Sequence, residues 1–177
     1  MHIHETRTQV AIVGAGPAGL TLSHLLAAQG IDSVVVEARE RHEIEGTIRA
    51  GILEQGTVDL LSGSGIDTRV HTEGARHDGI ELRFDGRGHR IDFARHVGRS
   101  VWLYPQHEVL KDLIATRVRD GADLRFGVSD VVLDGVGGTE PEVAFTDRDG
   151  NRTLLRCDVV AGCDGSAGVS RNAFPDG

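Results

Sequence analysis

Residues 9–19 of this chain read Gln-Val-Ala-Ile-Val-Gly-Ala-Gly-Pro-Ala-Gly, and this stretch decides the fold. Its first part, Gln9–Val13, is a short β-branched run that ends in glycine, which predicts a buried strand. Pro17 stands where a helix can begin, because the amide hydrogen that proline lacks is not needed in the first helical turn. An apolar stripe at helical spacing then predicts the buried face of that helix; its members are Ala18, Leu22, Leu25 and Leu26.

A second strand follows this helix closely. Gly30 is placed to end the helix in a left-handed turn, and Ser33–Glu37 is another β-branched run. A strand, a helix and a strand in so short a stretch predict parallel strands joined by a right-handed crossover. We therefore expect an α/β fold with a Rossmann-like dinucleotide-binding core.

The loop from Gly14 to Gly19 fits the pattern G-x-G-x-x-G between strand and helix. In that pattern Gly14 makes the tight turn, Gly16 lets the backbone approach a pyrophosphate, and Gly19 allows the helix to pack against the strand. The helix start offers unpaired N–H groups to phosphates, and Glu37 is placed to accept hydrogen bonds from ribose hydroxyls. The pattern predicts an adenine dinucleotide site but does not choose between FAD and NAD, and packing alone is the competing explanation for its glycines.

The composition excludes several other classes. At about 150 residues per domain, the 177 residues make one domain and a fraction, and the 24 glycines indicate many tight turns. A net charge of −8 disfavours binding to nucleic acid or to an anionic membrane. Without a long apolar run or a signal peptide, we expect a soluble cytoplasmic protein. We expect Cys157 and Cys163 to be buried or neutral thiols. The spacing of the histidines does not match that of a metal site.

The remainder of the chain mixes helices with antiparallel strands. Alternating apolar and polar residues on both sides of Asp85-Gly86 predict a hairpin over Ile80–Phe93. Trp102 and Tyr104 lie on a strand-like stretch and favour core packing over flavin stacking. The other expected elements are a helix around Glu54–Ser62, a helix over Leu110–Val118, two strands around Asp149-Gly150, and a strand with a polar turn over Cys157–Gly165.

Three further segments carry a resemblance to a known family. They are Ile48-Arg-Ala-Gly-Ile-Leu-Glu-Gln-Gly56, Tyr104-Pro-Gln-His-Glu-Val109, and Ala161-Gly-Cys-Asp-Gly165 continued through Ser170-Arg171. In these segments the chain resembles the 4-hydroxybenzoate 3-monooxygenases, which are class A flavoprotein aromatic hydroxylases. The resemblance is collinear from Gln9 onward. It extends to Gly168, which stands where the broader group of flavin hydroxylases usually carries serine.

The resemblance implies which positions hold FAD. The glycine loop would face the pyrophosphate, the carboxylate after the second strand would face the adenosine ribose, and the next loop would run along the flavin. Two later positions would bind FAD, the second of them also serving the nicotinamide nucleotide. In this order the residues are Gly14, Gly16, Ala18 and Gly19; Glu37; Thr47, Ile48, Arg49, Ala50, Gly51 and Ile52; Gln106; and Asp164 with Gly165.

Three of the polar members of this set also have a plainer interpretation. The guanidinium of Arg49 would lie near the pyrophosphate, where its fixed fork of donors suits phosphate oxygens, but it could be an exposed surface arginine. Gln106 could be an ordinary helix cap. Asp164 could be an aspartate that merely forms a turn.

The activity implied by the resemblance is hydroxylation of 4-hydroxybenzoate to 3,4-dihydroxybenzoate. In the family, NAD(P)H reduces FAD, and O₂ then forms the flavin C4a-hydroperoxide that attacks the aromatic ring. The groups that orient and ionise the substrate in relatives lie beyond Gly177, so no catalytic residue is named in this chain. We expect residues 1–177 to be a truncated FAD-binding domain, inactive alone, in which 78–97 form the first hairpin of an incomplete substrate domain. Family members are commonly homodimers, and the sequence leaves the oligomeric state of this protein open.

Other functions remain open at this point. One is hydroxylation of another phenolic acid, since the residues that set specificity are absent. A second is a non-catalytic fragment that binds FAD or nucleotides. An NAD-dependent dehydrogenase leaves the joint presence of Arg49, Gln106 and the Asp164-Gly165 turn unexplained.

The electron donor is expected to be NADH or NADPH, with NADH used at least as well as NADPH. Relatives that prefer NADPH carry basic or phenolic side chains after the second strand, where this chain has Ala38, Glu43 and Thr47. A 2′-phosphate carries about two negative charges, so missing cations and an added carboxylate should weaken NADPH binding. Arg39 and Arg41 are close enough in sequence to compensate.

Overall fold

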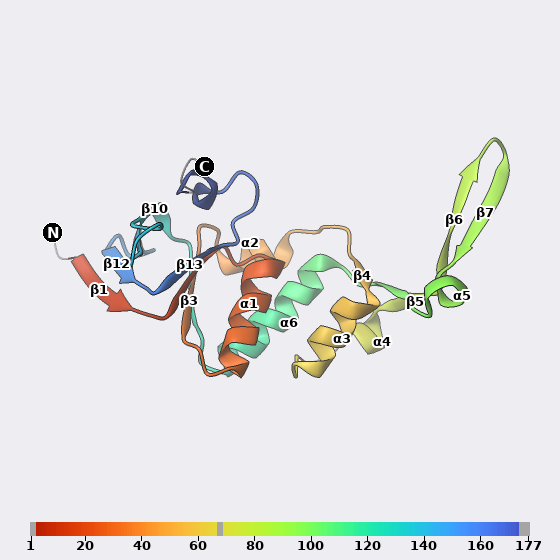
Figure 1. The fold of residues 1–177 in the computed structure, drawn as a ribbon, viewed down its shortest axis with the longest axis horizontal. Coiled ribbons are helices and arrows are strands. Elements are labelled where there is room, and N and C mark those ends of the chain that lie inside the picture. The colour runs from red at the N-terminus through yellow and green to blue at the C-terminus, as the bar shows by residue number, and fades with distance from the viewer. Residues whose placement is uncertain (1–2, 67–68, 174–177) are drawn as a thin grey trace. The chain divides into compact units, whose positions relative to one another are not determined.

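The computed structural model describes residues 3–66 and 69–173. The chain divides into two compact units. The first comprises Met1–Thr47 with Leu113–Gly177, and the second comprises Ile48–Asp112. Figure 1 shows the elements of both. Those of the first unit are β1 (Ile3–Arg7), β2 (Val10–Val13), α1 (Pro17–Ala28), β3 (Ser33–Glu37), α2 (Arg41–Gly46), the later turns of α6 (Gln106–Arg119), β9 (Asp123–Phe126), β10 (Ser129–Asp134), β11 (Glu142–Thr146), β12 (Arg152–Arg156), β13 (Val159–Gly162) and the 3₁₀ turn η1 (Val169–Ala173).

A parallel sheet forms the centre of the first unit. Its strand order is β13-β2-β3-β9, and every neighbouring pair is parallel. In the register of this sheet Val13 pairs with both Val36 and Gly162, so the carboxyl ends of β2, β3 and β13 lie side by side. In open α/β sheets this is the edge at which ligands bind.

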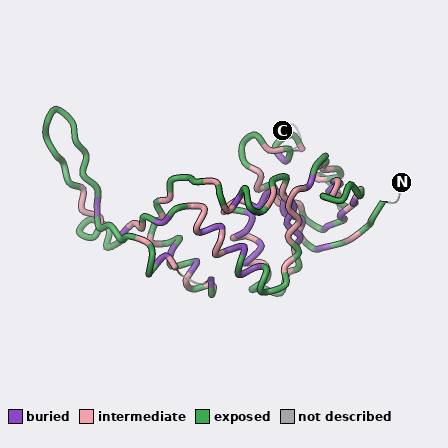
Figure 2. Tube along the Cα trace, turned by 180° about the vertical axis from the view of Figure 1, so that it is seen from behind, coloured by how far each residue is buried: buried purple, intermediate pink, exposed green. Residues whose placement is uncertain are grey.

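The two faces of this sheet are covered differently. On one face Ala11, Val13, Val34 and Val36 join a buried cluster with Phe145 and other residues of a second, mixed sheet, whose order is β1-β12-β11-β10. Of the alternate residues, Ile12 and Val35 are also almost fully buried, which agrees with the near-continuous apolar runs typical of parallel strands. Figure 2 marks the buried residues along the chain in purple.

The buried face of α1 differs from the predicted apolar stripe. Leu22, Leu25 and Leu26 are only partly buried and Ala18 is exposed, whereas the buried residues are Gly19, Leu20, Ser23 and His24. The reason is the close approach of Gly19 to the Gly14 backbone. This approach directs Gly19, and the residues one helical turn after it, toward the sheet. Ser23 then contacts the Ser33 hydroxyl at 3.3 Å and accepts a hydrogen bond from the buried Arg117 at 3.2 Å.

The second unit combines short strands with helices. Its three-stranded sheet has the order β4-β8-β5, and β6 and β7 form a separate hairpin whose side chains are mostly exposed (Figure 2). The hairpin turns at Asp85 and Gly86, both with positive φ. Its elements are β4 (Ile52–Glu54), α3 (Gln55–Gly63), α4 (Val70–Glu73), β5 (Ala75–His77), β6 (Gly79–Phe84), β7 (Arg87–Asp92), α5 (Phe93–Val97), β8 (Val101–Leu103) and the first turns of α6.

The predicted fold class is confirmed. The opening strand, helix and strand appear as β2, α1 and β3, and the predicted hairpin appears as β6 and β7. The two strands around Asp149-Gly150 are β11 and β12. Tyr104 is buried, as expected, whereas Trp102 is only partly buried and donates its indole N–H to the Gln55 side chain at 3.2 Å. No helix among the described residues is long and apolar enough to cross a membrane.

Candidate cofactor site

Gly14 lies where the backbones of two strands meet. Its φ is +106°, and its N–H donates to the Val36 carbonyl oxygen at 2.8 Å. A Cβ at this position would lie 2.5 Å from the Cys163 carbonyl oxygen and 2.8 Å from the Asp164 nitrogen. Only glycine fits both the conformation and the space.

Gly19 serves the packing of α1. A Cβ on Gly19 would overlap the Gly14 carbonyl oxygen and lie 3.2 Å from a methyl group of Ile12. The first turn of α1 therefore passes directly over the turn after β2. The roles expected for Gly14 and Gly19 in shaping the loop agree with this geometry.

Gly16 differs from these two glycines. Its backbone is extended, with φ −76° and ψ −176°, a conformation that any residue adopts. A Cβ added there would meet nothing within 4 Å. Among the described residues nothing therefore requires glycine at this position, and close approach of a ligand to this backbone stays a prediction.

The start of α1 is open to an anion. Gly16 is its N-cap residue and makes no side-chain capping bond, Pro17 opens the helix, and its first turn contains no acidic residue. The first amides of a helix lack intrahelical partners and carry partial positive charge. Together with the vacant space at Gly16, this makes a cradle that fits the pyrophosphate of a dinucleotide.

Glu37 connects this cradle to the end of β3. Its Oε2 accepts the Ala15 N–H at 2.8 Å, and its Oε1 accepts the Arg39 N–H at 3.0 Å. The side chain is 11% exposed. A carboxylate has about four acceptor positions, so the two backbone bonds leave acceptor capacity for ribose hydroxyls. Contact with the ribose stays a prediction.

Asp164 and Gly165 follow β13 beside the cradle. The Cys163 N–H donates to the Val13 carbonyl oxygen at 2.7 Å, which fixes this turn against β2. The Asp164 Oδ2 accepts the Ser170 N–H at 2.9 Å, and any Cβ at Gly168 would overlap the Asp164 carboxylate. Asp164 therefore does form a turn, and its contact with nucleotide stays a prediction. Gly165 has a φ of +82°, which favours glycine.

The second unit brings Gly51 and Gln106 together. The Tyr104 N–H donates to the Gly51 carbonyl oxygen at 3.1 Å, and a Cβ on Gly51 would lie 2.7 Å from the Gln106 nitrogen. The pairing of β4 with β8 aligns the two segments. Of the remaining predicted loop, Ile48, Arg49, Ala50 and Ile52 are exposed, and Thr47 of the first unit donates its hydroxyl to the Glu43 carbonyl oxygen at 2.5 Å.

The surroundings of both cysteines disfavour the reactive thiolate form. Burial raises the pKa of both thiols, and the Asp164 charge raises that of Cys163 further. Cys157 is buried and donates to the Pro141 carbonyl oxygen at 3.4 Å. Within residues 3–66 and 69–173, no three side chains of His, Cys, Asp or Glu gather in a way that could hold a metal ion.

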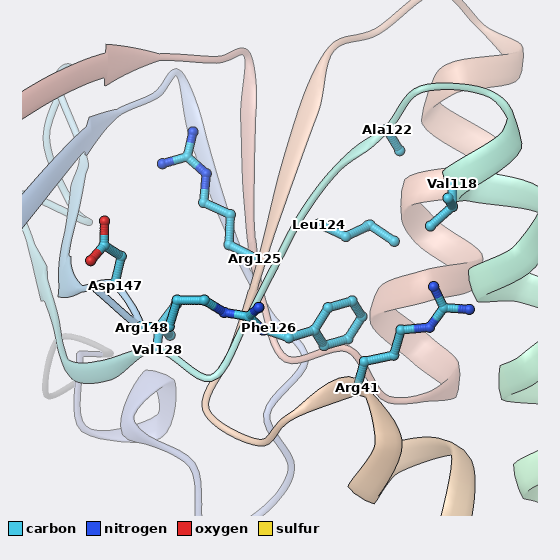
Figure 3. Close-up of a pocket in the computed structure, with 9 residues that line it drawn as sticks. All are labelled: Arg41, Val118, Ala122, Leu124, Arg125, Phe126, Val128, Asp147 and Arg148. Atoms are coloured by element: carbon cyan, nitrogen blue, oxygen red, sulfur yellow. The ribbon is translucent and has the colours of Figure 1, made fainter. Parts of the chain in front are cut away.

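A separate pocket of about 440 Å³ lies along β9 in the first unit. Figure 3 shows Leu124 and Phe126 on one side of this strand and Arg125 on the other. Its arginines already pair with carboxylates: Arg41 with Glu45 at 2.7 Å, Arg125 with Asp123 at 2.7 Å, and Arg148 with Glu40 at 2.8 Å. The pocket therefore offers no uncompensated positive charge to an anion. It is lined by Arg41, Val118, Ala122, Leu124, Arg125, Phe126, Val128, Asp147 and Arg148.

The parallel sheet, the glycine turn and the open helix start define a dinucleotide-binding protein of the α/β class. The chain belongs to the family described as the FAD binding domain, whose model matches residues 7–176.

Relatives and solved structures agree with this family. The chain is 41% identical over 170 residues to p-hydroxybenzoate hydroxylase of Acinetobacter baylyi, covering 96% of this chain and 42% of that protein. It is 33% identical to 6-methylpretetramide 4-monooxygenase of Streptomyces rimosus, covering 89% and 38%. The solved anhydrotetracycline hydroxylase of the same organism superposes with a TM-score of 0.76 at 26% identity, covering 94% and 33%. The chain thus spans less than half the length of these relatives.

Two glycine substitutions distinguish a glycine that the fold requires from a glycine that ligand binding requires. Gly16→Ala should leave the free energy of unfolding within about 0.5 kcal/mol of the native value, because its Cβ meets open space, yet weaken binding of FAD or ADP at least about tenfold. Gly14→Ala should lower the free energy of unfolding by more than about 2 kcal/mol, through backbone overlap and strain. Denaturant unfolding and nucleotide titration check both. Equal nucleotide affinity of Gly16→Ala and native protein would contradict the assignment of this space to phosphate.

Proposed function

We propose that this chain is the FAD-binding part of a flavin-dependent aromatic hydroxylase that converts 4-hydroxybenzoate to 3,4-dihydroxybenzoate. The observation that supports FAD most directly is the space at Gly16, which the fold leaves vacant at the start of α1. The aromatic substrate is proposed because the Acinetobacter relative at 41% identity is named p-hydroxybenzoate hydroxylase.

The proposed roles follow the geometry of each unit. In the first unit the amides around Gly16 and Ala18 bind the pyrophosphate, and Glu37 binds the adenosine ribose. In the second unit the loop from Ile48 to Ile52 and the side chain of Gln106 contact FAD. Bound FAD would supply the redox chemistry that activates oxygen, while the protein holds the cofactor in place and excludes water from it.

Two alternatives remain beside this proposal. A related phenolic acid is the substrate if the residues that set specificity differ from those of the p-hydroxybenzoate relative. A non-catalytic fragment that binds FAD or nucleotides is the second alternative. In that case the chain binds FAD without turning over any substrate.

The visible spectrum of the purified chain with FAD tests the cofactor. After desalting, we expect a yellow protein whose flavin absorption bands are shifted from those of free FAD, because the isoalloxazine ring leaves bulk water. Gly16→Ala is the matched variant and should retain much less flavin. A colourless native protein after incubation with excess FAD would overturn the proposal for this chain.

We further propose NADH as the electron donor. The carboxylate of Glu43 is held in a capping box, accepting the Glu40 N–H at 2.8 Å. The two cations that could attract a 2′-phosphate have carboxylate partners: Arg39 lies 3.4 Å from Glu37, and Arg41 lies 2.7 Å from Glu45. Little positive charge is therefore left uncompensated in this loop to select NADPH.

Cofactor preference can be measured as kcat/KM in the full-length enzyme. We expect NADH to be used at least as well as NADPH. Glu43→Gln keeps the capping box, because glutamine fits that position, and should raise kcat/KM for NADPH about two- to fivefold by removing a charge worth about 1 kcal/mol at close range. Glu140→Gln, the same change in an exposed loop, should alter neither value. A tenfold native preference for NADPH would contradict the proposal.

A further inference from the structure

A cluster of titratable side chains in the second unit has no role in the proposed function. Asp112 lies at its centre and is 10% exposed at the side chain. Its Oδ2 accepts the Tyr104 hydroxyl at 2.7 Å, and its Oδ1 accepts the Arg69 Nε–H at 2.6 Å. Arg69 also pairs with Glu108 at 2.8 Å. Both oxygens of the carboxylate are therefore engaged by donors from two different segments.

Keeping these groups buried is unfavourable in itself. Burial raises the pKa of the Asp112 carboxyl, since the lost solvation exceeds what its two hydrogen bonds return, and burial likewise raises the pKa of Tyr104. Apolar residues of similar volume would fill the same space at no such cost, and replacing a buried ion pair by them is often neutral for stability. Apolar packing lacks the directionality of hydrogen bonds. The bond from Arg69 holds the Asp112 carboxylate in place, and the bond from the Tyr104 hydroxyl then holds the tyrosine ring in one orientation.

Tyr104 transmits that orientation to the backbone at Gly51. The ring is 2% exposed and its hydroxyl is held by Asp112, while its backbone N–H donates to the Gly51 carbonyl oxygen at 3.1 Å. The next residue is Pro105, which restricts the conformation of both itself and Tyr104. Gln106 follows at once and lies against Gly51, with no room for a Cβ between them. Fixing the phenol therefore fixes the segment that presents Gln106.

We propose that Asp112 is a positioning residue for FAD, acting through Tyr104 to hold Gly51 and Gln106 in the arrangement that receives the flavin half of the cofactor. This inference rests on the proposed function. It assigns the affinity for the flavin half to the second unit, separately from the pyrophosphate cradle of the first.

The test compares FAD with ADP, which lacks the flavin. Asp112→Leu removes both acceptors and should weaken FAD binding at least about tenfold while changing the affinity for ADP less than about twofold. Tyr104→Phe loses a single hydrogen bond and should weaken FAD binding about three- to tenfold. Asp112→Asn should stay within about threefold of native, because its amide oxygen accepts from Arg69 and its amide nitrogen donates to the phenol oxygen.

Val58→Ala is the matched control for stability. Val58 is fully buried in the second unit and takes no part in the cluster, so this variant is destabilised without loss of positioning. It should bind FAD as the native protein does at a temperature well below unfolding. Hydrogen exchange at the Tyr104 amide should accelerate in Asp112→Leu relative to Val58→Ala.

Two negative results are distinguishable. A native chain that binds neither FAD nor ADP would overturn the proposed function together with this inference. Native binding of FAD with equal affinities for Asp112→Leu and Val58→Ala would overturn the inference alone. So would an equal loss of FAD and ADP binding in Asp112→Leu, because that result indicates a general structural role.

Discussion

The structure depends on backbone meeting backbone at Gly14. There the turn after β2 lies against the Cys163–Asp164 peptide, and the first turn of α1 lies over the same turn. Contacts this close are possible only where no side chain lies between the three segments. The segments are brought together by the parallel register of β2, β3 and β13. Everything proposed for the cofactor begins from this junction, because it places the start of α1 at the carboxyl edge of the sheet, just after β2.

The polar contacts around this junction are made mostly by carboxylates to backbone amides. Glu37 ties Ala15 to the loop after β3, and Asp164 ties its own turn to Ser170. Each carboxylate satisfies donors that would otherwise lack partners near a crowded turn. These bonds lie within the protein itself, and they organise the loop that would face a nucleotide. Preorganisation of this kind reduces the entropy that binding must overcome.

Much of this arrangement was predictable from the sequence because it is local. The glycine spacing and the β-branched runs predict β2, α1 and β3, and the Asp85-Gly86 pair predicts the hairpin turn, since in both cases adjacent residues determine the conformation. The buried face of α1 was not predicted correctly. Hydrophobicity marked the leucines, whereas the approach distance at Gly19 determined which side faces the sheet.

The cluster around Asp112 lay beyond sequence reasoning for a different reason. Arg69, Tyr104 and Asp112 are far apart along the chain or separated by a turn, and no pattern marks them as partners. The only available signal was an aspartate among the apolar residues of α6, beside Leu113. Likewise, the sequence shows that Gly16 belongs to a motif, but only the structure shows that none of the described residues fills the space beside it.

Phosphate binding in the open space beside Gly16 is the interaction on which the proposed function depends most. The most direct measurement is a titration of the ¹⁵N-labelled chain with ADP, following each backbone amide by NMR. We expect the amides of Gly16, Ala18 and Gly19 to shift most, with little change in the β6–β7 hairpin. Unchanged amides at these three positions under saturating ADP, or larger shifts elsewhere, would contradict this expectation.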